Sequence, residues 1–260
     1  MRDFLKAETY YVVKDPTFRG ISVVLLLGSA LLLFWMGSQV GFGIDSPLEP
    51  LITSVQLSFF LYFIIPVYVC FFTTEGFEQG SVQNIIASGQ SRSLYILGKY
   101  LTGLKIILCW VLQFFGLFYA LYILAALVTG SHIGNENLGI KFIAALGAIG
   151  FNILYLAAYS AVVMMFGVLM KKTASAIVAT FVFIFGDFLL SGYLKDSPSV
   201  YLRMISDHTL TTQIFKFSAV KKLLLFDLND YIQVTLIPVI LIVICLIVAL
   251  VIFEKRDIHL

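Results

Sequence analysis

Charged side chains are scarce in this chain. Of its 260 residues, 17 are Lys or Arg and 15 are Asp or Glu, together 12%, whereas 60% are hydrophobic. This balance excludes an ordinary water-soluble protein, which needs far more polar surface to cover its core. The formal net charge of +2 is also too small to indicate binding to nucleic acid.

Residues that build metal sites and catalytic sites are equally few. The sequence contains only three cysteines, Cys70, Cys109 and Cys245, and three histidines, His132, His208 and His259. The cysteines fall inside apolar stretches without disulfide or zinc spacing, and the histidines fall outside them. No H-E-x-x-H pattern is present, and no intramembrane Ser–His pair can form. We therefore predict no catalytic residue, no metal site and no enzyme activity on this chain alone.

Long apolar runs are what the sequence has in abundance. Five runs contain no charged residue, and a sixth contains only Asp187. A bilayer core of about 30 Å requires roughly 20 apolar residues per helix, and every run reaches that length. We predict an all-α integral membrane protein, one transmembrane domain over 1–260, with six transmembrane helices near 20–42, 51–73, 106–129, 142–170, 173–194 and 232–253. The longest loop, 195–231, leaves no room for a soluble catalytic domain.

The distribution of basic residues predicts the orientation. With a cytoplasmic N-terminus, the inner segments hold 11 Lys and Arg and the outer segments hold 6. The positive-inside rule then favours both termini inside. The outer loop 195–231 carries five of those six, but four aspartates offset them. Within this loop, Val200–Ile205 and Ile214–Phe226 are predicted as short helices on the outer membrane face.

Residues 1–19 are predicted to form an amphipathic helix on the inner membrane surface. Phe4, Tyr11 and Val12 share one helical face, and Pro16 ends the helix. A plain solvated tail is the alternative.

The segment between spans two and three carries the functional prediction. Phe77, Val82, Ile85 and Ile86 recur at near-helical spacing, and Gly80 and Gly89 bracket the stretch. This pattern predicts a short cytoplasmic helix parallel to the membrane. Such a helix offers a docking surface that transmits force from a soluble partner to the spans, whereas the alternative is an ordinary solvated loop.

The residues of this segment resemble those of a known family. Glu75, Glu78-Gln79-Gly80-Ser81, Ile85-Ile86, Ser88-Gly89, Ser91-Arg92 and Gly98-Lys99-Tyr100 follow one another after the second span. This order is similar to that of type-2 ABC exporter permeases, above all the small permeases of antimicrobial-peptide immunity, bacteriocin and cytolytic-peptide exporters. The layout of six spans in about 250 residues with an amphipathic start is similar too.

The resemblance implies a partner and a mechanism. Two permease chains, expected as a homodimer, would pair with two copies of a separate ABC ATPase that binds ATP and Mg²⁺. The pair would export an amphipathic peptide by alternating access across a bacterial cytoplasmic membrane. Coupling to the ATPase would involve Glu75, Phe77, Glu78, Gly80, Ser81, Ile85, Ser88, Gly89 and Arg92. Glu75, Glu78 and Arg92 would meet charged groups of the ATPase or pair within the permease.

The chain itself has no nucleotide site. Ala87-Ser88-Gly89-Gln90-Ser91 is faintly similar to the Leu-Ser-Gly-Gly-Gln signature of ABC ATPases but lacks its second glycine. The G-x-x-x-x-G-K-[ST] phosphate loop is absent, because Tyr100 follows Gly98-Lys99 and Ser93 replaces the first glycine. We predict no cofactor on this chain.

Four polar residues inside the spans are candidates for a pathway or gate. Asp187 would lie about 20 Å along its helix, where a charge is costly, and it is either a pathway acid or a hydrogen-bonded structural group. Asn152, Tyr155 and Tyr159 share a helical face, which suits either a cavity or interhelical packing. Two alternative functions follow: an ion-coupled transporter that uses Asp187, or export of a lipid-like or hydrophobic small molecule by the same ABC architecture.

Overall fold

The computed structural model describes residues 2–43, 47–131, 138–218 and 227–255, and all regular secondary structure in this part of the chain is helical. The helices are α1 (Arg2–Lys14), α2 (Pro16–Val40), α3 (Glu49–Leu57), the 3₁₀ turn η1 (Ser58–Phe60), α4 (Leu61–Glu78), α5 (Ser81–Ala87), α6 (Arg92–Val128), α7 (Leu138–Met170), α8 (Thr173–Lys195), α9 (Val200–Asp207), α10 (Leu210–Ser218) and α12 (Leu228–Lys255).

Six helical segments are long and apolar enough to cross a membrane, which confirms that part of the prediction. They cover Pro16–Gln39, Glu49–Glu78, Arg92–Val128, Phe142–Met170, Thr173–Lys195 and Leu228–Lys255. The third differs most from its predicted bounds, because α6 begins at Arg92 rather than near residue 106. Ser91 sets this start, since its hydroxyl accepts a hydrogen bond from the backbone N–H of Leu94 at 3.3 Å.

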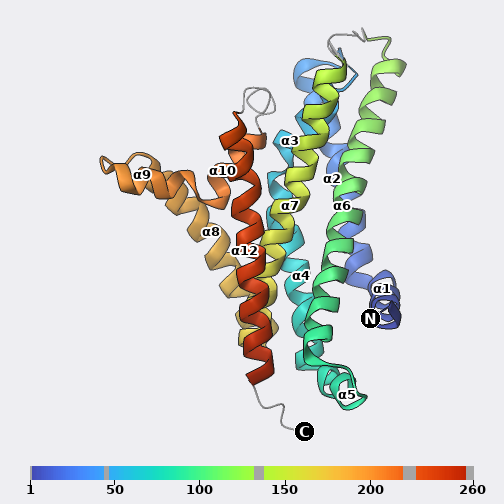
Figure 1. Ribbon diagram of the computed structural model, residues 1–260. Helices are drawn as coiled ribbons and strands as arrows, with labels where there is room; N and C mark the ends of the chain where they lie inside the picture. The colour runs from blue at the N-terminus through green and yellow to red at the C-terminus, as the bar shows by residue number, and fades with distance from the viewer. Residues whose placement is uncertain (1, 44–46, 132–137, 219–226, 256–260) are drawn as a thin grey trace.

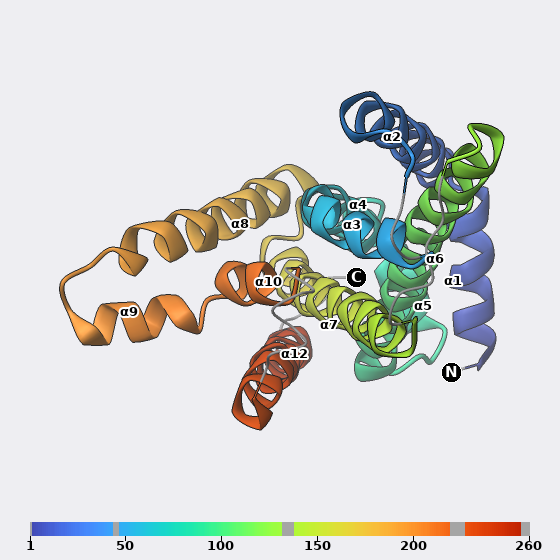
Figure 2. The same ribbon diagram turned by 90° about the horizontal axis from the view of Figure 1, so that it is seen from above.

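The helix α7 occupies the centre of the bundle and contacts α4, α6, α8 and α12 (Figure 1, Figure 2). Small residues make this possible: Ala148, Ala158 and Ala161 are completely buried, and small side chains let helices approach closely in a bilayer. Large aromatic side chains fill the space between α4, α6 and α7. They include Tyr62, Trp110, Phe114, Tyr155 and Tyr159.

The helix α8 diverges from the bundle, and α9 and α10 bring the chain back toward α7 and α12 (Figure 1, Figure 2). The predicted helix Val200–Ile205 is present as α9. The second predicted helix, Ile214–Phe226, was placed too late, because α10 begins at Leu210. The residues 219–226 of that prediction lie outside the described part of the chain.

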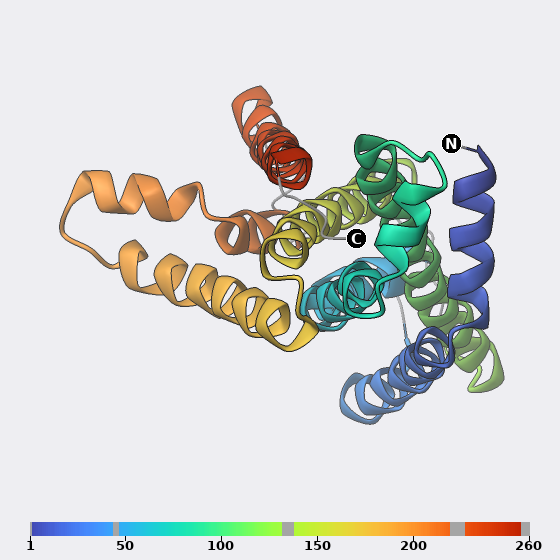
Figure 3. The ribbon, with the colours of Figure 1, turned by 90° about the horizontal axis from the view of Figure 1, so that it is seen from below.

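Four segments meet at one end of the bundle: α1, α5, the turn between α7 and α8, and the last turn of α12 (Figure 1, Figure 3). They are the segments that the charge count assigns to one side of the membrane. The helix α1 runs across the bundle axis (Figure 2, Figure 3) and ends where Asp15 caps α2, accepting from the N–H of Thr17 at 2.8 Å. Pro16 is thus the first residue of α2, as the predicted break requires.

Candidate functional site

The short helix α5 forms between α4 and α6 because glycines allow two sharp turns. Gly80 has a φ of 70° and Gly89 a φ of 94°, a left-handed conformation that costs other residues far more. The predicted helix bracketed by these glycines is therefore present, but it covers only Ser81–Ala87. Four of the predicted coupling residues lie outside this helix: Glu75, Phe77 and Glu78 belong to α4, and Arg92 begins α6.

The two faces of α5 differ in character. Val82 is buried, and Ile85 and Ile86 are half-buried against a cluster that includes Tyr95 and Phe253. The opposite face presents exposed Gln83, Asn84, Ala87 and Ser88, followed by exposed Gly89. Apolar packing thus fixes α5 to the bundle, and its polar face is left toward the surroundings.

Glu78 links α4 to α8. Its Oε1 accepts a hydrogen bond from the backbone N–H of Thr173, the first residue of α8, at 2.6 Å. The hydroxyls of Thr74 and Thr173 also lie 2.8 Å apart. A carboxylate at a helix N-terminus satisfies an otherwise unpaired N–H and complements the helix dipole, so Glu78 holds the start of α8 beside the end of α4.

Arg92 makes the corresponding link to α12. Its guanidinium donates to the carbonyl of Phe253 at 3.2 Å and to that of Glu254 at 2.8 Å. These carbonyls belong to the last turn of α12, where a cation is favoured by the helix dipole. Glu78 and Arg92 therefore bond within this chain, on either side of α5 in the sequence.

Glu75 connects α4 to α1. Its Oε1 accepts from the hydroxyl of Tyr11 at 2.6 Å and from the side-chain amide of Gln79 at 2.9 Å. The hydrogen bond to Glu75, followed by burial, raises the pKa of Tyr11 well above its usual range, because the ionised phenol would lose that bond and face the carboxylate. Tyr11 therefore stays a donor at physiological pH.

The remaining predicted coupling residues have local roles. Phe77 packs edge-on against Tyr95 and Phe253, with ring centroids 6.3 Å and 5.8 Å away. The hydroxyl of Ser81 donates to the carbonyl of Gly76 at 3.3 Å, and that of Ser88 to the carbonyl of Ile85 at 2.7 Å. Phe77 thus belongs to the apolar cluster against which α5 packs, and the two serines stabilise the turns at the start and the end of α5.

A buried ion pair fixes α1 to the same end. The ammonium of Lys99 on α6 lies 2.9 Å from Glu8 Oε2, and their side chains are only 8% and 11% exposed. Lys99 also lies over the Phe72 ring, 4.0 Å from its centroid. Nearby, a Cβ at Gly98 would overlap the ring of Phe4, so this glycine lets α1 approach α6 closely.

A pocket of about 370 Å³ opens between α1, α4 and α5. Its lining brings together Glu8, Tyr11, Glu75 and Lys99 with the α5 residue Ile85. Sequence reasoning assigned a coupling role to Glu75, Ser81 and Ile85 but gave none to Glu8, Tyr11 and Lys99. The available signals were the place of Tyr11 on the shared face of residues 1–19 and that of Lys99 in the Gly98-Lys99-Tyr100 pattern.

The predicted pathway residues of α7 form packing contacts. Asn152 is completely buried, and its Oδ1 accepts from the hydroxyls of Ser58 at 3.0 Å and Tyr62 at 2.9 Å. Tyr159 packs against Tyr62 with ring centroids 5.6 Å apart, and its hydroxyl lies 3.4 Å from Asp187 Oδ2. The hydroxyl of Tyr155 is buried without a hydrogen-bond partner among the described residues.

Asp187 connects α8 to α10. Its Oδ2 accepts from the backbone N–H of Thr211 at 2.8 Å and from the Thr211 hydroxyl at 2.7 Å. Thr211 is the second residue of α10, so the carboxylate caps this helix. These contacts agree with the hydrogen-bonded structural role, one of the two interpretations open for this residue.

Within the described part of the chain, His, Cys, Asp and Glu side chains form no group that would hold a metal ion. No protein-family model matches the sequence, and no curated protein matches it either.

Proposed function

We propose that this chain is the membrane-spanning subunit of an ABC exporter and that a separate ATPase docks on α5. The observation that carries the proposal is the position of α5. Its polar face is exposed, and its flanking residues Glu78 and Arg92 bond to the ends of α8 and α12. A displacement of α5 would therefore reach four of the six long helices. α4 and α6 are covalently connected to α5, and α8 and α12 are linked to its flanking residues by these hydrogen bonds.

The proposed assembly contains two permease chains with both termini in the cytoplasm of a bacterial cell, and two ATPases that bind ATP and Mg²⁺. The sequence resemblance supports the pairing. Apolar side chains such as Val182, Leu189 and Tyr193 are exposed along the outward helix α8, and in a bilayer they would contact lipid or the second copy of the chain.

The proposed cargo is an amphipathic antimicrobial or cytolytic peptide. The sequence resemblance supports this choice, and the apolar, aromatic character of the spans is compatible with it. Export of a lipid-like molecule by the same architecture is the alternative. The Asp187-coupled transporter is less well supported, because the Asp187 carboxylate is bonded to the first turn of α10.

Docking is tested with two matched serines. Ser88, which caps the C-terminus of α5, and Ser38 on α2 are both exposed. Each hydroxyl bonds a carbonyl three residues earlier, that of Ile85 and that of Trp35. Ser88→Arg places a bulky cation on the docking face, whereas Ser38→Arg places it at the opposite end of the bundle. We expect Ser88→Arg to abolish co-purification with the ATPase encoded beside this chain and Ser38→Arg to leave it intact.

Coupling is tested separately from docking. We expect Arg92→Ala and Glu78→Ala to retain the ATPase but to reduce peptide-stimulated hydrolysis, because each variant removes the hydrogen bonds through which α12 or α8 is linked to the ends of the α5 segment. Equal stimulation in both variants and in the wild type would contradict the proposed route, even if the ATPase binds.

A further inference from the structure

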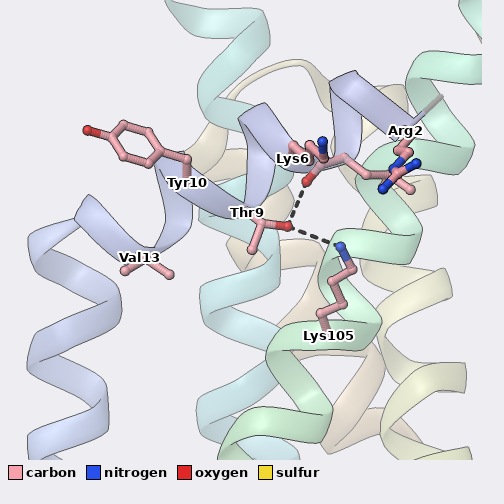
Figure 4. Close-up of a pocket in the computed structure, with 7 residues that line it drawn as sticks. Arg2, Lys6, Thr9, Tyr10, Val13 and Lys105 are labelled. Carbon is pink, nitrogen blue, oxygen red and sulfur yellow. Dashed lines mark hydrogen bonds between the residues drawn. The ribbon is translucent and has the colours of Figure 1, made fainter.

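A second pocket, of about 710 Å³, is formed by α1 and Lys105 of α6, on a different face of α1 from the Glu8–Lys99 pair. Its lining consists of Arg2, Leu5, Lys6, Thr9, Tyr10, Val13 and Lys105. Figure 4 shows Arg2, Lys6 and Lys105 at one end of this pocket and Tyr10 and Val13 at the other. The pocket is thus basic at one end and apolar at the other.

The amphipathic character of α1 explains this separation. At 100° per residue, the lining residues of α1 fall within an arc of about 140°, and Glu8 lies about 60° beyond the edge of that arc. Glu8 is buried against the bundle, where it pairs with Lys99. The seven lining residues contain three cations and no acid. Of the two acids in α1, Asp3 is exposed in the first turn and is not part of the lining, and Glu8 is neutralised by Lys99.

The pocket lies at the level along the bundle where the surface of a bilayer is expected. Lys105 is the last charged residue before the charge-free stretch that begins at residue 106. Its ammonium reaches back to the hydroxyl of Thr9 at 3.1 Å (Figure 4), the direction expected of a lysine that extends from a membrane span toward the headgroups. Arg19, just before the charge-free stretch of α2, donates to the carbonyl of Val13 at 3.0 Å.

The apolar end of the pocket lies at the same level, where the headgroups of a bilayer would meet its acyl chains. The side chains of Tyr10 and Val13 are 68% and 52% exposed, and the chain enters α2 directly after them. Exposed apolar side chains at the start of a span suit the first part of a lipid acyl chain better than water.

We propose that this pocket binds one anionic phospholipid of the inner leaflet. The phosphate would lie between Arg2, Lys6 and Lys105, where ammonium and guanidinium groups donate charge-assisted hydrogen bonds to phosphate oxygens. An acyl chain would pass Tyr10 and Val13 into the bilayer beside α2. The inference depends on the six membrane-spanning helices and not on the ABC assignment, so it can hold if that assignment fails.

The test is native mass spectrometry of the purified full chain in detergent, titrated with phosphatidylglycerol or with phosphatidylcholine of the same acyl chains. We expect one phosphatidylglycerol to bind preferentially. Lys6→Gln with Lys105→Gln should weaken it roughly 25-fold, since each basic side chain near an anionic headgroup contributes roughly fivefold. Lys6→Arg with Lys105→Arg keeps the charges and should keep the binding.

The matched control removes two charges elsewhere at the same end. Lys172 and Lys255 are exposed and outside the pocket, so Lys172→Gln with Lys255→Gln should bind phosphatidylglycerol as the wild type does. Melting curves of every variant identify any loss of fold.

Three results would overturn the proposal. The first is equal binding of both lipids, which would indicate nonspecific annular contact. The second is an equal loss of binding in the control variant. The third is full competition by millimolar inorganic phosphate, which would indicate a site for a soluble anion instead of a lipid.

Discussion

The buried pair Glu8–Lys99 makes a prediction about how α1 is attached. Two opposite charges 2.9 Å apart attract by about 6 kcal/mol at an effective dielectric constant of about 20, and desolvation offsets most of this energy. Removing one partner leaves the other buried without compensation and costs about 3–5 kcal/mol. We therefore expect Lys99→Met to destabilise the contact between α1 and α6 by about that amount.

Hydrogen–deuterium exchange of α1 in detergent micelles measures this effect. Because about 1.4 kcal/mol corresponds to a factor of 10, amides of α1 should exchange at least about 100-fold faster in Lys99→Met, whereas those of α7 should change little. The double variant Glu8→Met with Lys99→Met removes both charges and should exchange more slowly than Lys99→Met alone. Unchanged exchange in Lys99→Met, or faster exchange in the double variant, would refute the reasoning.

Three further variants test other contacts. Gly98→Leu should lower the free energy of unfolding by about 1–3 kcal/mol through overlap with Phe4, and adding Phe4→Ala should restore part of it; no loss in Gly98→Leu would contradict the close packing of α1. Asn152→Ala should cost about 1–3 kcal/mol in the same unfolding assay, because the hydroxyls of Ser58 and Tyr62 lose a buried acceptor, and Tyr62→Phe should cost less. Asp187→Ala should accelerate amide exchange at Thr211, the capped N–H of α10, without affecting α4; unchanged exchange there would contradict the capping role.

The long helices and the existence of α5 were predictable because their signals are local. A stretch of about 20 apolar residues requires a helix in a bilayer whatever its neighbours are. Two glycines nine residues apart mark the ends of a short element. The position of α10 was less predictable, since its start depends on Asp187 in another helix.

The contacts of the residues predicted to take part in coupling could not be predicted from the sequence. Glu78 bonds a residue 95 positions later, and Arg92 bonds carbonyls 161 and 162 positions later. Charged residues in a loop-like segment are consistent with either an external partner or an internal one. Only the packing of α8 against α4 and of α12 against α6 decides which groups come within hydrogen-bonding distance.

The most direct test of the central proposal is co-purification of this chain with the ABC ATPase encoded beside it, followed by ATP hydrolysis assays with and without candidate amphipathic peptides. The account predicts an assembly of two permeases and two ATPases whose hydrolysis an amphipathic peptide stimulates. Failure to assemble with any ABC ATPase would contradict it.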